Sequence, residues 1–280
     1  QKRSRLAEGD APALTRLEAL DLASRLLDGS RHKLSQHGVS LLPPDAAVVQ
    51  RYAHARRNLR HEDVCLLGFR QYAGNDAVLS APEAAHIIAF CEREVEWEPR
   101  LGNSGRELHG TERKLFGVTM DSSYRPLVGS ATPLPPLLEA LGERVLRFMK
   151  SQSWEMSRSP IGDVSRFDQA YIQKYPPGGS AQASTLGFHF DHRTAYGELI
   201  CGVTICGSGK LLLAGSNGTD FIDQPERTMR QANVHVSHLE PRSVYAMTGL
   251  ARYDLRHAVV NDSANVRISI TFRAVNWDKA

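Results

Sequence analysis

The sequence has only four cysteines in 280 residues, and none of them forms a CxxC pair. Four isolated thiols do not provide a disulfide framework or a thiolate zinc site. This pattern favours reduced cysteines and therefore an intracellular protein of the nucleus or the cytoplasm. The chain begins with Gln and no apolar signal core follows, so we expect a trimmed N-terminus, which leaves organelle targeting open.

Long hydrophobic runs are also missing. The chain has no run of about 18 apolar residues, so the sequence predicts no transmembrane helix. Internal repeats and low-complexity segments are absent as well. Apolar residues make up 41% and charged residues 23% of the chain, which is typical of a water-soluble globular protein.

Strong net charge of either sign is missing, too, but the charge is unevenly distributed. The whole chain carries +3, yet residues 1–61 hold 11 Lys and Arg against 6 Asp and Glu. The remaining residues hold 23 against 25, so the basic excess lies in the N-terminal part. Helical periodicity over 10–35 and 44–60 predicts a basic, helical extension (1–61) ahead of a main domain (62–280). The basic excess in residues 1–61 is compatible with nucleic-acid binding but is not by itself evidence for it.

The main domain begins with mixed elements. VCLLGF (64–69) reads as a strand, and the polar segment around HGTERKLFGVTM (109–120) as a hairpin. Ser80–Trp97 reads as a helix, with Ser80 as N-cap and Glu83 three residues later. Leu134–Gln152 is a second amphipathic helix.

The rest of the chain is dominated by short strands. The candidates are 170–175, 188–192, 199–206, 210–215, 243–249, 255–260 and 266–273, separated by turns rich in Gly, Pro and Asn. Helices followed by such strands predict an α+β, mainly β fold, in which helices support a jelly-roll or barrel. A long excursion at 215–232 interrupts this region where a substrate-facing loop would fit.

A metal site is indicated by His189-Phe190-Asp191. On a strand, residues i and i+2 point to the same face, so this imidazole and carboxylate can meet one ion. His257 is the favoured third ligand; His238 and His235 are alternatives, whereas His192 should point away. Two histidines and a carboxylate form the facial triad of non-haem Fe(II) oxygenases, although the same set also suits a zinc hydrolase.

The segment VRISITFR (266–273) alternates apolar and polar residues and places Arg267 and Arg273 on its polar face. If that face is solvent-exposed, both arginines are simply solvated. If it lines the interior, the guanidiniums need an anion, because burying an unpaired charge is costly. A carboxylate matches the planar fork of arginine, so a chelating keto acid with a second carboxylate satisfies both the metal and an arginine.

Together these residues resemble the AlkB family of Fe(II)/2-oxoglutarate dioxygenases, and the segment around Thr248–Tyr253 is most similar to its eukaryotic members. The resemblance implies a double-stranded β-helix, that is, a jelly-roll, over about residues 64–280. It implies that Fe(II) is held by His189, Asp191 and His257. Tyr175 and Arg267 would hold the distal carboxylate of 2-oxoglutarate, and O2 would be the co-substrate. The remaining co-substrate contacts would be Arg273 at the chelating end, with Gln173 and Ser269 where the family usually has asparagines.

The same resemblance implies oxidation of a substrate C–H, with release of succinate and CO2, leading to demethylation or hydroxylation. Family members act on modified bases in RNA or DNA, and in some cases on proteins. The segment ahead of the barrel supplies positive and aromatic side chains for a single-stranded nucleic acid: Arg106, Arg113, Lys114, Phe116 and Tyr124. We therefore expect a monomeric enzyme acting on modified nucleic acid. A protein substrate, a non-catalytic binding module and an ordinary solvated hairpin remain alternatives.

Overall fold

A computed structural model describes residues 64–65, 68–101, 107–127, 132–152, 164–177, 185–214, 234–253, 255–261 and 263–277. The predicted helical extension (1–61), Arg106 and the excursion at 215–232 lie outside these residues. No helix within the described segments is long and apolar enough to cross a membrane.

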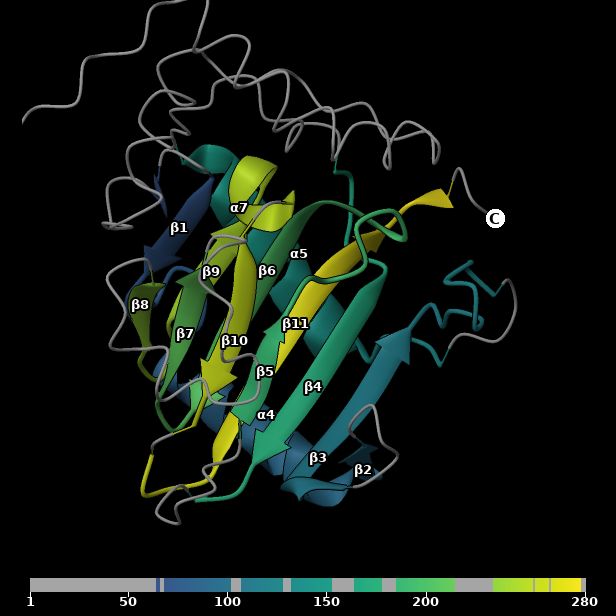
Figure 1. The fold of residues 1–280 in the computed structure, drawn as a ribbon. Helices are drawn as coiled ribbons and strands as arrows, with labels where there is room; N and C mark the ends of the chain where they lie inside the picture. Colours follow the sequence, from purple (N-terminus) through teal and green to yellow (C-terminus); the bar gives the residue numbers. More distant parts are fainter. Residues whose placement is uncertain are drawn as a thin grey trace, which may run out of the picture.

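Two antiparallel sheets form the body of the molecule (Figure 1). The larger sheet has the order β1-β9-β6-β11-β4-β3-β2. Its strands are β1 (Phe69–Tyr72), β9 (Val244–Met247), β6 (Tyr196–Cys206), β11 (Arg267–Val275), β4 (Gln169–Tyr175), β3 (Glu107–Gly117) and β2 (Glu98–Leu101). The smaller sheet consists of β5 (Thr185–His189), β10 (Arg256–Val260), β7 (Gly209–Ala214) and β8 (Val234–Leu239). A core cluster with side chains from both sheets fills the space between them, which confirms the predicted jelly-roll.

Two helices cover the outer face of the larger sheet: α4 (Ala81–Arg93) and α5 (Pro136–Ser151) (Figure 1). The capping box predicted for α4 is present, with reciprocal contacts between Ser80 and Glu83. The apolar face of β11 packs into this helix-covered core through Ile268, Ile270 and Phe272. Its other face therefore points between the sheets and carries Arg267 and Arg273.

Several element predictions were wrong in detail. Val64 and Cys65 are helical, and β1 begins only at Phe69. The segment 109–120 is not a hairpin of its own: most of it belongs to β3, which pairs with β2 upstream. Thus strands also lie before and between the helices, and β8 was not predicted as a strand. A short helix, α7 (Gly249–Tyr253), separates β9 from β10.

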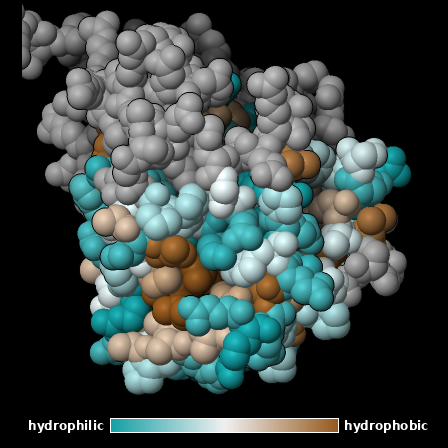
Figure 2. Space-filling model, turned by 90° about the horizontal axis from the view of Figure 1, so that it is seen from below, coloured by the Kyte–Doolittle hydropathy of each residue, from teal (hydrophilic) through white to brown (hydrophobic). Residues whose placement is uncertain are grey.

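The surface at one end of the molecule is mixed in character. Figure 2, which views the molecule from below relative to Figure 1, shows apolar groups gathered in the middle of this face with hydrophilic side chains around them. The polar boundary limits the apolar area that this end presents to water.

Candidate metal centre and co-substrate cavity

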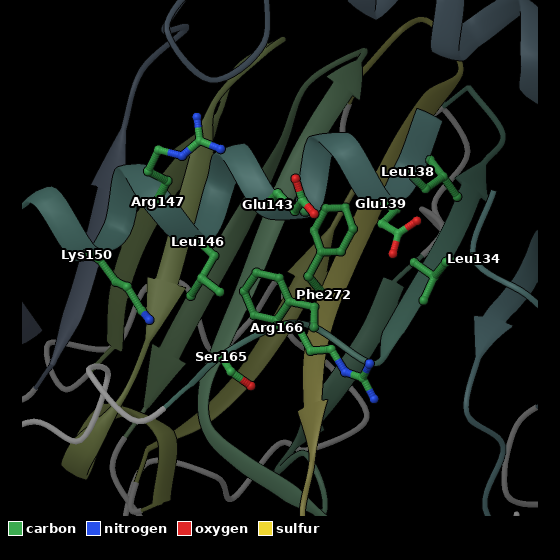
Figure 3. A pocket seen from close by; sticks show the side chains of 12 residues that line it. Leu134, Leu138, Glu139, Glu143, Leu146, Arg147, Lys150, Ser165, Arg166 and Phe272 are labelled. Atoms are coloured by element: carbon green, nitrogen blue, oxygen red, sulfur yellow. The ribbon is translucent and has the colours of Figure 1, made fainter. Parts of the chain in front are cut away.

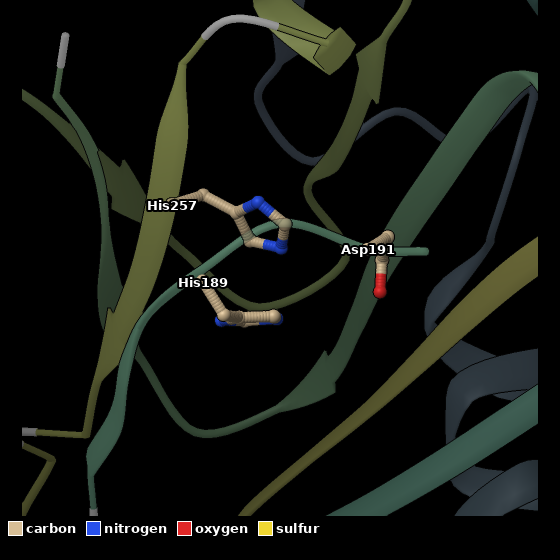
Figure 4. Close-up of side chains that lie close together, drawn as sticks. All are labelled: His189, Asp191 and His257. Carbon is tan, nitrogen blue, oxygen red and sulfur yellow. The ribbon is translucent and has the colours of Figure 1, made fainter. Parts of the chain in front are cut away.

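Three side chains converge between the two sheets. His189 ends β5 and His257 lies on the neighbouring strand β10, where the two residues are direct partners in register. Their ring centroids lie 4.2 Å apart. Asp191 follows just beyond β5, and one ligand atom from each of the three residues lies within 4.8 Å of the others (Figure 4). Among the described residues this is the one group of three or more His, Cys, Asp or Glu side chains with metal-binding geometry.

The protonation states of these groups suit a cation. Burial and the neighbouring His189 lower the pKa of His257 to about 3, and burial also lowers the pKa of His189. Burial opposes ionisation of Asp191, but Arg273 and the two histidines outweigh it and lower the pKa of the carboxyl. Near neutral pH the site therefore presents two neutral imidazoles and one carboxylate, which is the form that binds metal.

Hydrogen bonds orient these ligands. Nδ1 of His189 lies 2.8 Å from the carbonyl oxygen of Gly187; because a carbonyl only accepts, Nδ1 donates and Nε2 is left for a metal. Arg273 donates from Nη2 to Oδ1 of Asp191 at 2.8 Å. Arg252 donates to the backbone carbonyl oxygens of Asp191 and His192 at 3.2 and 3.0 Å. Arg252 was not among the predicted site residues, although it lies within the segment that carries the family resemblance.

Arg267 is a buried cation without an ion pair among the described residues. It is 2% exposed, and burial lowers its pKa. Nη1 and Nη2 donate to the hydroxyls of Ser269 and Thr204 at 3.3 and 3.1 Å, and the guanidinium lies over the ring of Tyr175. Within the described residues, its Nε and the hydroxyl of Tyr175 are buried without a hydrogen-bond partner. A carboxylate would satisfy all these donors, so the residues fit the distal end of a dicarboxylic co-substrate.

A cavity of about 340 Å³ opens beside the three metal-ligand candidates. Its lining includes the triad, Arg273 and Gln173, whose side-chain Nε2 is buried without a partner. Arg267, Tyr175 and Ser269 do not line it; they lie farther along the same face of the larger sheet. Strand register places Arg267 opposite Tyr175 and Ser269 opposite Gln173, so the five predicted co-substrate residues share one interior face.

The described substrate residues that were predicted divide between the cavity and its outside; three of them, Arg113, Lys114 and Phe116, lie on β3. Arg113 and Tyr124 line the cavity. Phe116 is 8% exposed and packs against Phe90 in the helix-covered core, and Lys114 pairs with Glu98 at 3.3 Å outside the cavity. Successive strand residues alternate faces, so Lys114 and Phe116 lie on the side of β3 that points away from the cavity.

The other histidines considered for the metal site lie in two different places. His235 and His238 lie on β8, at the edge of the smaller sheet and outside the metal-ligand group. His192, however, does not point away: it lines the cavity and stacks on Tyr124, with ring centroids 4.0 Å apart. The prediction failed because β5 ends at His189, so strand alternation does not apply to His192.

Further basic and aromatic residues surround the cavity. Arg100 lines it and has a buried Nη1 without a partner. Phe190 also lines it, with the guanidinium of Arg193 3.9 Å and that of Arg256 5.5 Å from its ring centroid. The sequence predicted no role for these residues, although Phe190 lies within the His189-Phe190-Asp191 motif.

A second cavity, of about 350 Å³, lies on the opposite side of β11, against α5 (Figure 3). Phe272 and Leu138 line it together with charged side chains such as Glu139, Glu143 and Arg147. It is separated from the metal-ligand candidates by the larger sheet and contains none of them. The three metal-ligand candidates therefore belong to the cavity between the sheets.

No protein-family model and no curated protein sequence matches this chain. Several solved structures, however, do match this chain. OsALKBH1 matches with a TM-score of 0.51 at 15% identity, over 74% of this chain and 97% of that one. A 2OG-Fe(II) oxygenase family oxidoreductase from Burkholderia pseudomallei matches with a TM-score of 0.50 at 17% identity, over 86% and 98% of the two chains. A prolyl hydroxylase from Trichoplax adhaerens, solved with a hypoxia inducible factor peptide, gives 0.47 at 10% identity, over 82% and 91%. The chain has the AlkB-like fold of the 2-oxoglutarate- and Fe(II)-dependent oxygenases.

Proposed function

We propose that this protein is an Fe(II)- and 2-oxoglutarate-dependent dioxygenase that oxidises a modified nucleobase in RNA or DNA. One observation carries the proposal: the triad of His189, Asp191 and His257 faces a strand that buries Arg267 without an ion pair among the described residues. A metal and a dicarboxylate together satisfy both halves of this arrangement. The AlkB-like fold supports the same assignment.

With Fe(II) bound, one molecule each of 2-oxoglutarate, O2 and substrate C–H would give succinate, CO2 and the hydroxylated substrate. His189, Asp191 and His257 would hold the Fe(II), which when bound would supply the site where the co-substrate and O2 react. Arg267 and Tyr175 would anchor the distal carboxylate, and Arg273 holds Asp191 in place. The contribution of this chain is to orient the reactants and to keep bulk water from them.

Arg267 also distinguishes this proposal from a zinc hydrolase built on the same three ligands. A zinc hydrolase needs a metal and a water molecule, but it does not need an arginine that binds a carboxylate at a distance from the metal. A buried guanidinium whose only described side-chain acceptors are two hydroxyls has a high desolvation cost without an anion. This cost supports a dicarboxylate co-substrate.

The walls of the cavity support a nucleic-acid substrate. Single-stranded nucleic acids are bound by aromatic rings that stack on bases and by cations that contact phosphates. Here the Tyr124–His192 stack and Phe190 supply the rings, and Arg100 and Arg113 supply cations on the same cavity. Tyr124 is 47% exposed, so its ring is open to a ligand as well as to His192.

The test of the proposal is succinate formation by the Fe(II)-loaded protein with pools of methylated RNA, methylated DNA and peptides. We expect stimulation by a nucleic-acid pool. Arg113→Ala should lower this stimulation, whereas Lys114→Ala is a matched control, because Lys114 is the next residue on the same strand but outside the cavity. Stimulation by peptides alone would overturn the nucleic-acid assignment, and no succinate with any pool would count against the dioxygenase.

A further inference from the structure

The interior face of the larger sheet is arranged in successive rows across its strands. Along β11, Arg267 and Arg273 mark two rows, and Thr271 lies between them. In the row of Thr271, its partner on β6 is Gly202, and the partner of Gly202 on β9 is Tyr245. Tyr245 therefore lies in a row between the arginine of the proposed carboxylate clamp and the arginine that holds Asp191.

The ring of Tyr245 lies across the space above Gly202. A Cβ atom built on Gly202 would be 2.2 Å from the Tyr245 ring, a distance that real side chains do not reach. The ring of Phe69 packs near Tyr245 as well, with centroids 6.3 Å apart. Tyr245 is 7% exposed and belongs to the core cluster between the sheets, so it has little room to withdraw.

Tyr245 nevertheless faces the site. It lines the same cavity as His189, Asp191 and His257. Burial raises its pKa, and Asp191, Arg267, Tyr175 and Arg273 all act on the phenol electrostatically, which places it near both the metal ligands and the clamp. Its hydroxyl makes no hydrogen bond within the described part of the chain, so no internal contact accounts for its polar end.

We propose that Tyr245 is a wall of the co-substrate site, lying between the metal and Arg267, and that it restricts the site to unbranched 2-oxo dicarboxylates. This inference rests on the proposed function. A 2-oxo dicarboxylate that chelates the metal and reaches Arg267 has to pass its two methylene groups along the row of Thr271. The Tyr245 ring, held over Gly202, flanks that path. A methyl group on a methylene that faces the ring would meet it, and the buried ring, which packs against Gly202 and near Phe69, has little room to withdraw.

Gly202 has a defined part in this arrangement. Any side chain at this position would collide with the Tyr245 ring, so the ring would have to shift from its place. Because Gly202 has no side chain, the Tyr245 ring can lie over it, and the position of the ring depends on this glycine. Gly202→Ala should narrow the co-substrate path, whereas shortening Tyr245 should widen it.

The experiment measures binding to the Mn(II)-loaded protein by isothermal titration calorimetry, with 2-oxoglutarate and with its 3-methyl derivative as ligands. We expect the wild type to bind the derivative about tenfold or more weakly than 2-oxoglutarate, as for one misplaced methyl group in a close-fitting pocket. Tyr245→Phe keeps the ring and should keep this ratio. Tyr245→Ala, or Tyr245→Leu if the alanine variant does not fold, should reduce the ratio to about threefold or less.

Gly202→Ala supplies the opposite arm: 2-oxoglutarate binding should weaken by about tenfold while Mn(II) binding stays unchanged. The inference is overturned if the Tyr245→Leu ratio equals that of the wild type, or if the wild type binds both ligands equally well. A wild type that binds Mn(II) but no 2-oxoglutarate would instead overturn the proposed function, and the inference with it.

Discussion

Arg273 donates a hydrogen bond from Nη2 to Oδ1 of Asp191 at 2.8 Å, so the last arginine of β11 is bound to a carboxylate that belongs to the metal-ligand group. Asp191 is buried and Arg273 is largely buried, with side-chain exposures of 8% and 12%. The guanidinium lies between two aromatic rings, 5.4 Å from the Tyr171 centroid and 4.9 Å from that of Tyr196. An ion pair fixed in this way orients the carboxylate toward the two imidazoles.

Arg273→Ala should therefore weaken metal binding. Without the guanidinium, Asp191 loses both its orientation and the main charge that lowers its pKa against burial. We expect Mn(II) affinity to fall about 10- to 100-fold, as for other residues that orient metal ligands. Titration calorimetry with Mn(II) measures this change.

Arg166→Ala is the control for Arg273→Ala. Arg166 also pairs with an aspartate, Asp168, at 3.0 Å, but its side chain is 72% exposed, and exposed ion pairs contribute little. The Mn(II) affinity of the Arg166→Ala variant should equal that of the wild type. Equal losses in the two variants would mean that the Arg273–Asp191 contact has no specific part in metal binding.

Arg267→Met should separate stability from co-substrate binding. Replacing a buried charge by an apolar side chain of similar length removes its desolvation cost, and such changes are often neutral or stabilising by about 1–4 kcal/mol. We expect the ligand-free variant to be at least as stable as the wild type in denaturant unfolding.

In the same experiment, 2-oxoglutarate should stabilise only the wild type. At a ligand concentration of 100 times Kd, the expected gain in the free energy of unfolding is about 2.7 kcal/mol. A destabilised Arg267→Met variant that still gains stability from 2-oxoglutarate would show that Arg267 belongs to the structural core rather than to the co-substrate site.

The convergence of His189, Asp191 and His257 and the shared face of Arg267 and Arg273 could be predicted from sequence because strand alternation places side chains reliably. The alternating pattern of 266–273 predicts that Arg267 and Arg273 share a face, and the structure shows that this face is interior. His257 was separable from His235 and His238 only by its position within the β-region and by family resemblance.

The residues that sequence reasoning missed or misplaced depend on where strands end and on contacts between distant strands. His192 lines the cavity because β5 stops at His189, and strand boundaries are poorly defined by pattern alone. Tyr245 could not be singled out from the sequence, because its position at the cavity depends on Gly202, which lies 43 positions earlier and opposite it in the sheet. Phe116 was misassigned because an aromatic residue on a strand is read equally well as core or as surface.

Tyr124→Gly should weaken substrate binding without lowering thermal stability. Tyr124 has φ 58°, a left-handed conformation that costs a non-glycine residue about 1 kcal/mol or more. Glycine removes this strain, so thermal stability should be retained, but substrate loses the stacking ring. We expect unchanged 2-oxoglutarate affinity and weaker binding of a methylated oligonucleotide, measured by fluorescence anisotropy. Unchanged oligonucleotide affinity would exclude Tyr124 from substrate recognition.

The stability of the metal-free protein should fall with acid because of His257. Its pKa is about 3 in the folded protein, against 6.5 ordinarily. Between these values the unfolded chain binds a proton that the folded chain does not, so stability is full above pH 6.5 and declines as the pH falls toward 3. The slope from this one group is about 1.4 kcal/mol per pH unit.

His257→Gln removes the titrating ring, so denaturant unfolding of the metal-free variant between pH 5 and 6 should show a shallower slope than the wild type by about one proton. Identical slopes in the two proteins would mean that His257 is accessible to protons in the folded state.

The dioxygenase proposal is tested most directly by an anaerobic titration of the metal-free protein with Fe(II), in the presence and absence of 2-oxoglutarate, monitored by visible absorption. If the triad binds Fe(II) and Arg267 holds the other end of a chelating co-substrate, a metal-to-ligand charge-transfer band develops only when both are added. The band should be lost in His189→Ala and shifted to much higher 2-oxoglutarate concentrations in Arg267→Met. No band in the wild type, or an undiminished band in His189→Ala, would contradict the account.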